Sequence, residues 1–101
     1  MTIAPGLDLS EAALDDICRR YQIKELMLFG SAVRGELRPD SDVDLLVEFL
    51  PDSRIGLFEH FDAEQELSSL FGKKVDLVSK RALRERLRRE ILAEARVIYA
   101  A

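Results

Sequence analysis

The chain has 101 residues, of which 34% are charged and 48% hydrophobic, and its formal net charge at pH 7 is −4. This length predicts a single domain, residues 1–101, with a modest core and no room for a separate acceptor-binding domain. The acidic balance argues against a dedicated nucleic-acid-binding protein, and the lone cysteine, Cys18, cannot form an internal disulfide. Because no apolar run reaches transmembrane length and the N-terminus lacks a signal-peptide pattern, we expect a cytoplasmic protein without a membrane partner.

The first predicted elements are a helix over about residues 11–21, capped by Ser10, and a strand over residues 24–29. The strand ends at Gly30, where the lack of a side chain allows a sharp turn and a close approach of the backbone to a ligand. Ser31 and the residues after it predict a helix start, whose unpaired N–H groups would hold a phosphate together with the serine hydroxyl. The alternative is an ordinary turn that binds no ligand.

An acidic strand over residues 42–49, entered from the turn Pro39-Asp40-Ser41, is the next predicted element. Alternation along a strand places Asp42, Asp44 and Glu48 on one face and the apolar residues between them on the other. Close carboxylates repel each other unless a cation lies between them. Mg²⁺ in proteins is usually bound by one or two carboxylates together with substrate phosphates. The pattern therefore indicates phosphoryl or nucleotidyl transfer.

A long amphipathic helix is predicted over residues 57–71, and Gly72 ends it. The strand that follows, over residues 73–79, carries one acid, Asp76. If this strand pairs beside the acidic strand, Asp76 completes a triad able to hold two metal ions, one activating the attacking hydroxyl and one bound to the triphosphate. The alternative is a lone charge on an edge strand, which discourages aggregation.

The C-terminal segment is basic, since residues 73–101 carry 9 basic residues against 4 acids, whereas residues 1–72 carry 15 acids against 6 basic residues. A last helix is predicted from Leu83, Leu87 and Ile91, and Val97-Ile98-Tyr99 is expected to be a short apolar tail. The basic residues could contact a triphosphate, an acidic partner or RNA, or could form a solvated helix face. They are Lys80, Arg81, Arg84, Arg86, Arg88 and Arg89. Together the elements predict an α/β fold with helices packed on one small mixed sheet.

Four segments of the chain together resemble the minimal nucleotidyltransferases of the DNA polymerase β-like superfamily. They are Gly30-Ser31, Arg34-Gly35-Glu36, Ser41-Asp42-Val43-Asp44-Leu45-Leu46-Val47 and Val75-Asp76-Leu77-Val78. The spacing of the turn, the acid pair and the third acid is far more restrictive than a lone glycine motif. The resemblance implies that Gly30 and Ser31 hold nucleotide phosphates. It also implies that Asp42 and Asp44 bind Mg²⁺ and that Asp76 is the third metal ligand and the base.

Members of this family are similar to the antitoxins of two-gene modules, so the resemblance implies a helical toxin of the HEPN type as partner and transfer of AMP from ATP to a tyrosine of that toxin. Because the chain has no acceptor-binding domain, the partner or a second copy of the chain would complete the active site. Two alternatives stay open, namely a binding module that neutralises its partner by contact and a nucleotidyltransferase acting on a small molecule such as an antibiotic. Arg34 either contacts nucleotide phosphates or forms an ion pair with Glu36 or Asp40.

Overall fold

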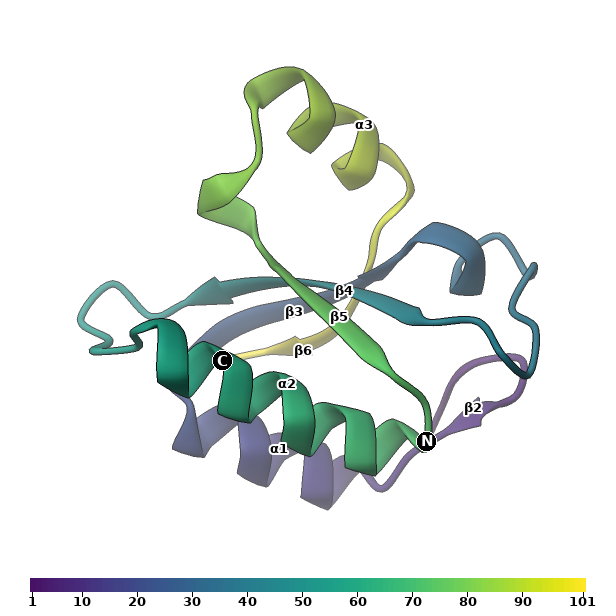
Figure 1. The fold of residues 1–101 in the computed structure, drawn as a ribbon, viewed down its shortest axis with the longest axis horizontal. Coiled ribbons are helices and arrows are strands. Elements are labelled where there is room, and N and C mark those ends of the chain that lie inside the picture. Colours follow the sequence, from purple (N-terminus) through teal and green to yellow (C-terminus); the bar gives the residue numbers. More distant parts are fainter.

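A four-stranded sheet in the order β5-β4-β3-β6 forms the centre of the molecule, and a small hairpin of β1 and β2 lies at the N-terminus (Figure 1). The computed structural model describes all residues from 1 to 101. In chain order the elements are β1 (Thr2–Ala4), β2 (Leu7–Asp8), α1 (Glu11–Arg20), β3 (Ile23–Phe29), the 3-10 turn η1 (Gly30–Ala32), β4 (Val43–Phe49), α2 (Leu57–Phe71), β5 (Val75–Ser79), the 3-10 turn η2 (Lys80–Ala82), α3 (Glu85–Glu94) and β6 (Arg96–Ala100). Strands β4 and β5 are parallel, whereas β3 is antiparallel to β4 and to β6. The predicted α/β fold on a mixed sheet is confirmed.

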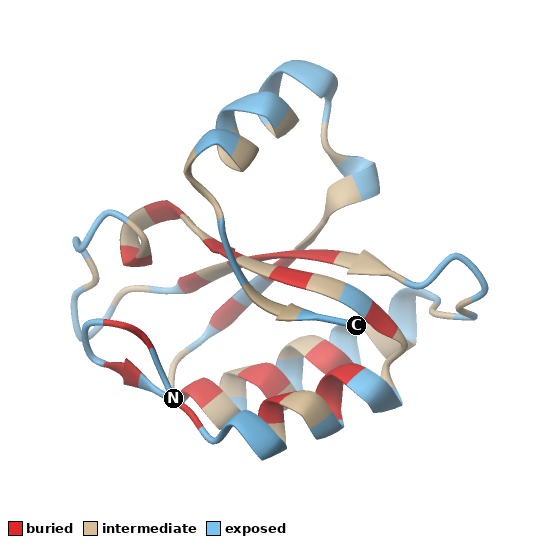
Figure 2. Cartoon of the chain, turned by 180° about the vertical axis from the view of Figure 1, so that it is seen from behind, coloured by how far each residue is buried: buried red, intermediate tan, exposed pale blue.

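Helices α1 and α2 cover one face of the sheet, and α3 stands over the opposite face (Figure 1). The core lies between the sheet and the first two helices, where Leu14, Leu67 and the strand residues Val43, Leu45 and Val47 are all at most 1% exposed. Every second side chain of β4 points toward these helices, and burying such a side chain contributes roughly 1.5–3 kcal/mol. Figure 2 shows buried positions along α1, α2 and the sheet, whereas α3 has no buried residue. No helix of the structure is long and apolar enough to cross a membrane.

The local signals for the first two long helices of the sequence are confirmed. Ser10 caps α1, since its hydroxyl oxygen accepts a hydrogen bond from the backbone N–H of Ala13 at 3.2 Å. The predicted helix over residues 57–71 has the bounds of α2, and it ends at Gly72 in a left-handed conformation with φ of 68°. Such a cap needs glycine because a side chain disfavours this backbone region.

The two ends of the chain differ from the sequence predictions. The expected apolar tail at residues 97–99 is wrong, because these residues belong to β6, which pairs with β3 through Leu26 and Tyr99. A pairing between segments this far apart in sequence leaves no local signal. The hairpin of β1 and β2 was not predicted either, and it adds the buried side chains of Ile3 and Leu7 to the core.

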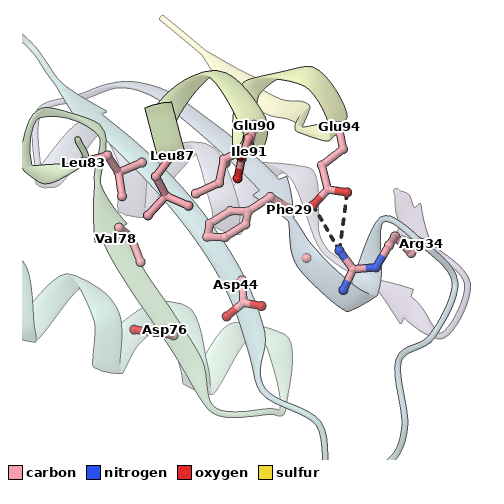
Figure 3. Close-up of a pocket in the computed structure, with 11 residues that line it drawn as sticks. Phe29, Arg34, Asp44, Asp76, Val78, Leu83, Leu87, Glu90, Ile91 and Glu94 are labelled. Atoms are coloured by element: carbon pink, nitrogen blue, oxygen red, sulfur yellow. Dashed lines mark hydrogen bonds and ion pairs between the residues drawn. The ribbon is translucent and has the colours of Figure 1, made fainter. Parts of the chain in front are cut away.

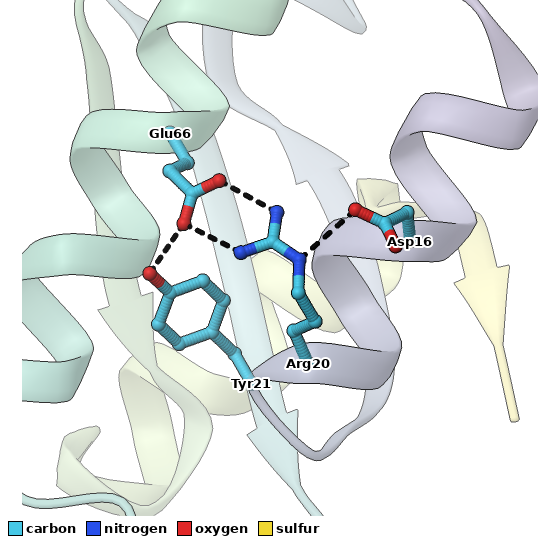
Figure 4. A network of polar contacts seen from close by, with 4 residues as sticks. All are labelled: Asp16, Arg20, Tyr21 and Glu66. Carbon is cyan, nitrogen blue, oxygen red and sulfur yellow. Dashed lines mark hydrogen bonds and ion pairs between the residues drawn. The ribbon is translucent and has the colours of Figure 1, made fainter.

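A polar network joins α1 to α2 on the outer surface (Figure 4). Arg20 donates to the two carboxylate oxygens of Glu66 at 2.9 and 2.6 Å and to Asp16 at 2.9 Å. The Tyr21 hydroxyl donates to the same Glu66 carboxylate. These hydrogen bonds, that from Arg20 above all, lower the pKa of Glu66 to about 2. The carboxylate therefore stays charged at neutral pH and links the two helices.

Candidate functional site

Asp44 of β4 and Asp76 of β5 are direct register partners across the only parallel strand pair of the sheet. Neighbouring strands lie roughly 4.8 Å apart, and partners in register share a face. Both acids line a cavity of about 560 Å³ on the sheet face beneath α3 (Figure 3). The predicted pairing of the Asp76 strand beside the acidic strand is therefore confirmed.

The cavity is lined by both polar and apolar residues (Figure 3). The polar or charged ones are Arg34, Asp44, Asp76 and, from α3, Glu90 and Glu94, and Gly30 adds backbone. The apolar ones are Phe29, Val78, Leu83, Leu87 and Ile91. The sequence analysis used the four-residue spacing of Leu83, Leu87 and Ile91 to predict a helix but not a cavity wall. The spacing in the sequence was enough to indicate a helix. Only the tertiary structure, in which the chain returns over the sheet, shows that the apolar residues of this helix line the cavity.

Asp42 lies outside this cavity. It is exposed and comes directly before β4, where the backbone N–H of Val43 donates to the carbonyl of Lys74 at 2.8 Å. Nowhere in the structure do three or more His, Cys, Asp or Glu side chains gather closely enough to hold a metal ion. The fold thus brings two of the three predicted acids into one cavity, and the negative charge of Asp42 reaches Asp44 from outside it.

The pKa of the Asp44 carboxyl is raised above its ordinary value. Burial is the largest cause, the negative charges of Asp76 and Asp42 add to it, and Arg34 partly opposes the rise. Like charges held this closely cost free energy unless a cation neutralises them. Since Mg²⁺ takes carboxylate oxygens as ligands, the donor set fits this ion chemically, with Asp44 and Asp76 adjacent and Asp42 within electrostatic reach.

Gly30 lies against the Asp44 carboxylate. Its φ is +75°, and a Cβ atom added there would lie 2.4 Å from Asp44 Oδ2. Both the backbone conformation and the limited space therefore favour glycine at this turn. The helix predicted from Ser31 is wrong, because only the 3-10 turn Gly30–Ala32 forms. The loop beyond it contains Gly35 at φ of +72° and Pro39, both of which disfavour a helix, and Ser31 does not line the cavity.

Arg34 lies at the edge of the cavity, between two carboxylates. Its Nε donates to Glu36 at 3.0 Å. Its Nη1 donates to Glu94 of α3 at 3.1 Å (Figure 3). These partners, Glu36 above all, raise the pKa of the guanidinium. The predicted ion pair with Glu36 is confirmed, whereas Glu94 is a partner sixty positions away that no local pattern indicated. The contact ties α3 to the glycine turn.

Paired carboxylates beside a glycine turn, on the sheet face opposite the packing helices, form an arrangement suited to nucleotidyl transfer. The chain belongs to the nucleotidyltransferase domain family, whose model matches residues 10–99. It is 38% identical over 84 residues to the protein adenylyltransferase MntA of Thermococcus cleftensis, and the alignment covers 83% of this chain and 81% of that protein.

Solved structures agree with this assignment. One, assigned provisionally as a minimal nucleotidyltransferase, is 41% identical with a TM-score of 0.73, covering 85% of this chain and 86% of that chain. Another, the tri-AMPylated Shewanella oneidensis HEPN toxin in complex with an MNT antitoxin, contains a chain 19% identical with a TM-score of 0.64, covering 90% of this chain and 70% of that chain. At that identity the likeness shows a shared fold. The predicted resemblance to minimal nucleotidyltransferases and the predicted enzyme class are confirmed, whereas the single-domain boundary stays a prediction.

Proposed function

We propose that this chain transfers AMP from ATP to a tyrosine hydroxyl of a helical HEPN-type toxin and so acts as the antitoxin of that partner. The observation that carries the proposal is the register pairing of Asp44 with Asp76 in a cavity that also reaches Gly30. Nucleotidyl transfer needs oxygen ligands for a cation and a base close to the attacking hydroxyl, and this pair can supply both. The name of the Thermococcus relative supports an adenylyl group and a protein acceptor.

In the proposed reaction the tyrosine oxygen attacks the α-phosphorus of ATP and forms a new P–O bond. The bond from the α-phosphorus to the oxygen that bridges to the β-phosphate breaks, and diphosphate leaves. Asp76 accepts the proton of the hydroxyl. Gly30 and Ser31 hold the triphosphate, since the backbone can approach a phosphate closely at a glycine. Arg34 exchanges one of its carboxylate partners for a phosphate oxygen, which a guanidinium binds well.

The proposed metal ligands are Asp42, Asp44 and Asp76. Asp42 belongs to this set because alternation places it on the same face as Asp44 and because its charge already raises the pKa of Asp44. Mg²⁺ bound there, as one ion or two, would neutralise the triphosphate and favour ionisation of the acceptor hydroxyl. The carboxylates themselves keep the cavity negative in the absence of a cation.

The partner is proposed from the comparisons. The described residues form a four-stranded sheet with helices packed on it, and we place the acceptor hydroxyl on a separate protein. In the Shewanella complex the HEPN toxin carries AMP and is bound to an MNT antitoxin. A HEPN-type toxin is therefore the proposed acceptor and ATP the proposed donor, and nucleic acid is not part of the proposal.

The test is transfer of α-labelled ATP, with Mg²⁺, into proteins of the native host's lysate. The wild-type chain is compared with the Asp42→Asn, Asp44→Asn double variant, and Asp52→Asn serves as the control because Asp52 is an exposed loop acid away from the cavity. We expect one labelled helical protein, AMP on a tyrosine by mass spectrometry, normal labelling with the control, and no label with the double variant.

Two outcomes would contradict the proposal. Label in RNA or in a small molecule instead of a protein would overturn the acceptor. Full neutralisation of a co-purified helical toxin by the double variant would overturn the catalytic account and support neutralisation by contact.

A further inference from the structure

The start of α2 carries the most exposed large apolar side chains of the molecule. Leu57 is 83% exposed, Phe58 is 82% exposed and Phe61 is 56% exposed, and Leu50, directly after β4, is 38% exposed. We call these four residues the α2 patch. Grouped exposed aromatic and aliphatic side chains mark interaction surfaces, since burying them against a partner removes apolar surface from water.

A hollow lies directly beside the α2 patch. It has a volume of about 550 Å³ and lies between the loop after β4, the first turn of α2 and η2. Its lining mixes apolar and polar residues, namely Phe49, Pro51, Ile55, Leu57 and Ala82 together with Ser53, Gly56, His60, Ser79 and Arg81. His60 holds one wall in place, because its Nε2 is hydrogen-bonded to the Leu77 carbonyl at 2.8 Å and its ring packs edge-on against Phe49. An apolar projection therefore lies beside a partly apolar hollow, and Leu57 belongs to both.

We propose that the α2 patch and this hollow bind a second copy of the chain. A two-fold symmetric interface uses the same surface on both copies, so each copy can insert its projection into the hollow of the other. The charges support this arrangement. Asp62 is exposed one residue beyond Phe61, Arg81 lines the hollow, and neither takes part in an ion pair of the chain. In the dimer, Asp62 of each copy faces Arg81 of the other.

The proposed interface is separate from the candidate site. Helix α2 covers the sheet face opposite α3, and the cavity with the paired acids lies beneath α3 (Figures 1 and 3). The dimer therefore leaves both cavities open to ATP and to an acceptor. Failure of the dimer would leave the proposed nucleotidyl transfer untouched, and failure of the transfer would leave the dimer untouched.

The first test is the mass of the purified chain by sedimentation equilibrium over a range of concentrations. We expect twice the 11.5 kDa of one chain. Phe58→Ser should raise the dissociation constant of the dimer by at least about tenfold, because each of the two copies loses an aromatic side chain from the interface. Val97→Ser is the matched control, since Val97 is 48% exposed on the edge strand β6, and it should leave the dissociation constant unchanged. Circular dichroism checks that each variant folds.

A charge exchange tests the arrangement directly. Asp62→Arg alone and Arg81→Asp alone should each weaken the dimer, because each places like charges opposite one another twice. Both changes in one chain should restore the dimer to within about threefold of the wild type, since the pair is re-formed with reversed signs.

The proposal would be overturned if the protein stays monomeric at every concentration at which it is soluble. A dimer that persists unchanged in Phe58→Ser would also overturn it, and so would one that is lost only in Val97→Ser, because the latter would place the interface on the β6 edge. A monomer whose α2 patch gains hydrogen-exchange protection only when a helical partner protein is added would assign the patch to that partner and overturn the second-copy interface.

Discussion

A Cβ atom at Gly30 would lie 2.4 Å from Asp44 Oδ2, closer than side-chain atoms approach one another in folded proteins. The backbone at Gly30 therefore packs directly against the side chain of Asp44 on β4. The Gly30 φ of +75° adds a second requirement for glycine at the same position.

Gly30→Ala should lower both stability and nucleotide binding. A side chain in the left-handed region costs about 1–2 kcal/mol, and the clash with Asp44 adds to this. Gly35→Ala is the matched control, because Gly35 has φ of +72° and nothing within 4 Å of the added Cβ atom. Chemical denaturation and Mg·ATP titration of both variants measure the difference. Equal losses in the two variants would show that the Asp44 contact has no effect of its own.

Asp44→Asn should lower the rate of AMP transfer by roughly a thousandfold or more if Asp44 acts through its charge. Without metal, the variant should be at least as stable as the wild type, because it removes a partly buried charge that Asp76 and Asp42 repel. Thermal unfolding in the presence of a chelator measures the second effect. Asp52→Asn provides the control for both measurements, and retained transfer by Asp44→Asn would contradict the assigned role.

Arg34→Ala should raise the KM for Mg·ATP by about tenfold, with a smaller effect on kcat. The reason is that its guanidinium lies at the cavity edge and can exchange a carboxylate for a phosphate. A tenfold change corresponds to about 1.4 kcal/mol of binding free energy. Arg38→Ala, an exposed arginine of the same loop, is the control. An unchanged KM accompanied by lower stability would mean that Arg34 serves only the ion pairs with Glu36 and Glu94.

Glu66→Gln should change how stability depends on pH. The folded pKa of Glu66 is about 2, below its ordinary value of about 4.3, so its stabilising contribution is fully present above about pH 4.3 and is lost as the pH falls toward 2. The side chain is 37% exposed, so the contribution is screened and should not exceed about 1 kcal/mol. Urea unfolding at pH 7 and pH 3 should show wild type and variant converging at the lower pH. A constant difference between them would contradict this role for the network with Arg20 and Tyr21.

Much of the fold follows from local patterns. The Ser10 cap, the glycine that ends α2 and the alternation of β4 each act over a few neighbouring residues, and all three lie where the sequence predicts them. The helix predicted at Ser31 failed because the glycine and proline that follow outweigh a favourable first turn. The strand β6 was missed because its partner β3 is supplied by a distant part of the chain.

The candidate site divides in the same way. Residue types and short spacings were enough to indicate Gly30 and the acid pair, because a tight turn and the repulsion between carboxylates are local properties. Only the tertiary structure places Asp76 beside Asp44, leaves Asp42 outside the cavity, brings Glu94 to Arg34 and turns the apolar side of α3 toward the acids. Those relations depend on the parallel pairing of β4 with β5 and on the return of α3 over the sheet, and both join segments that are far apart in the sequence.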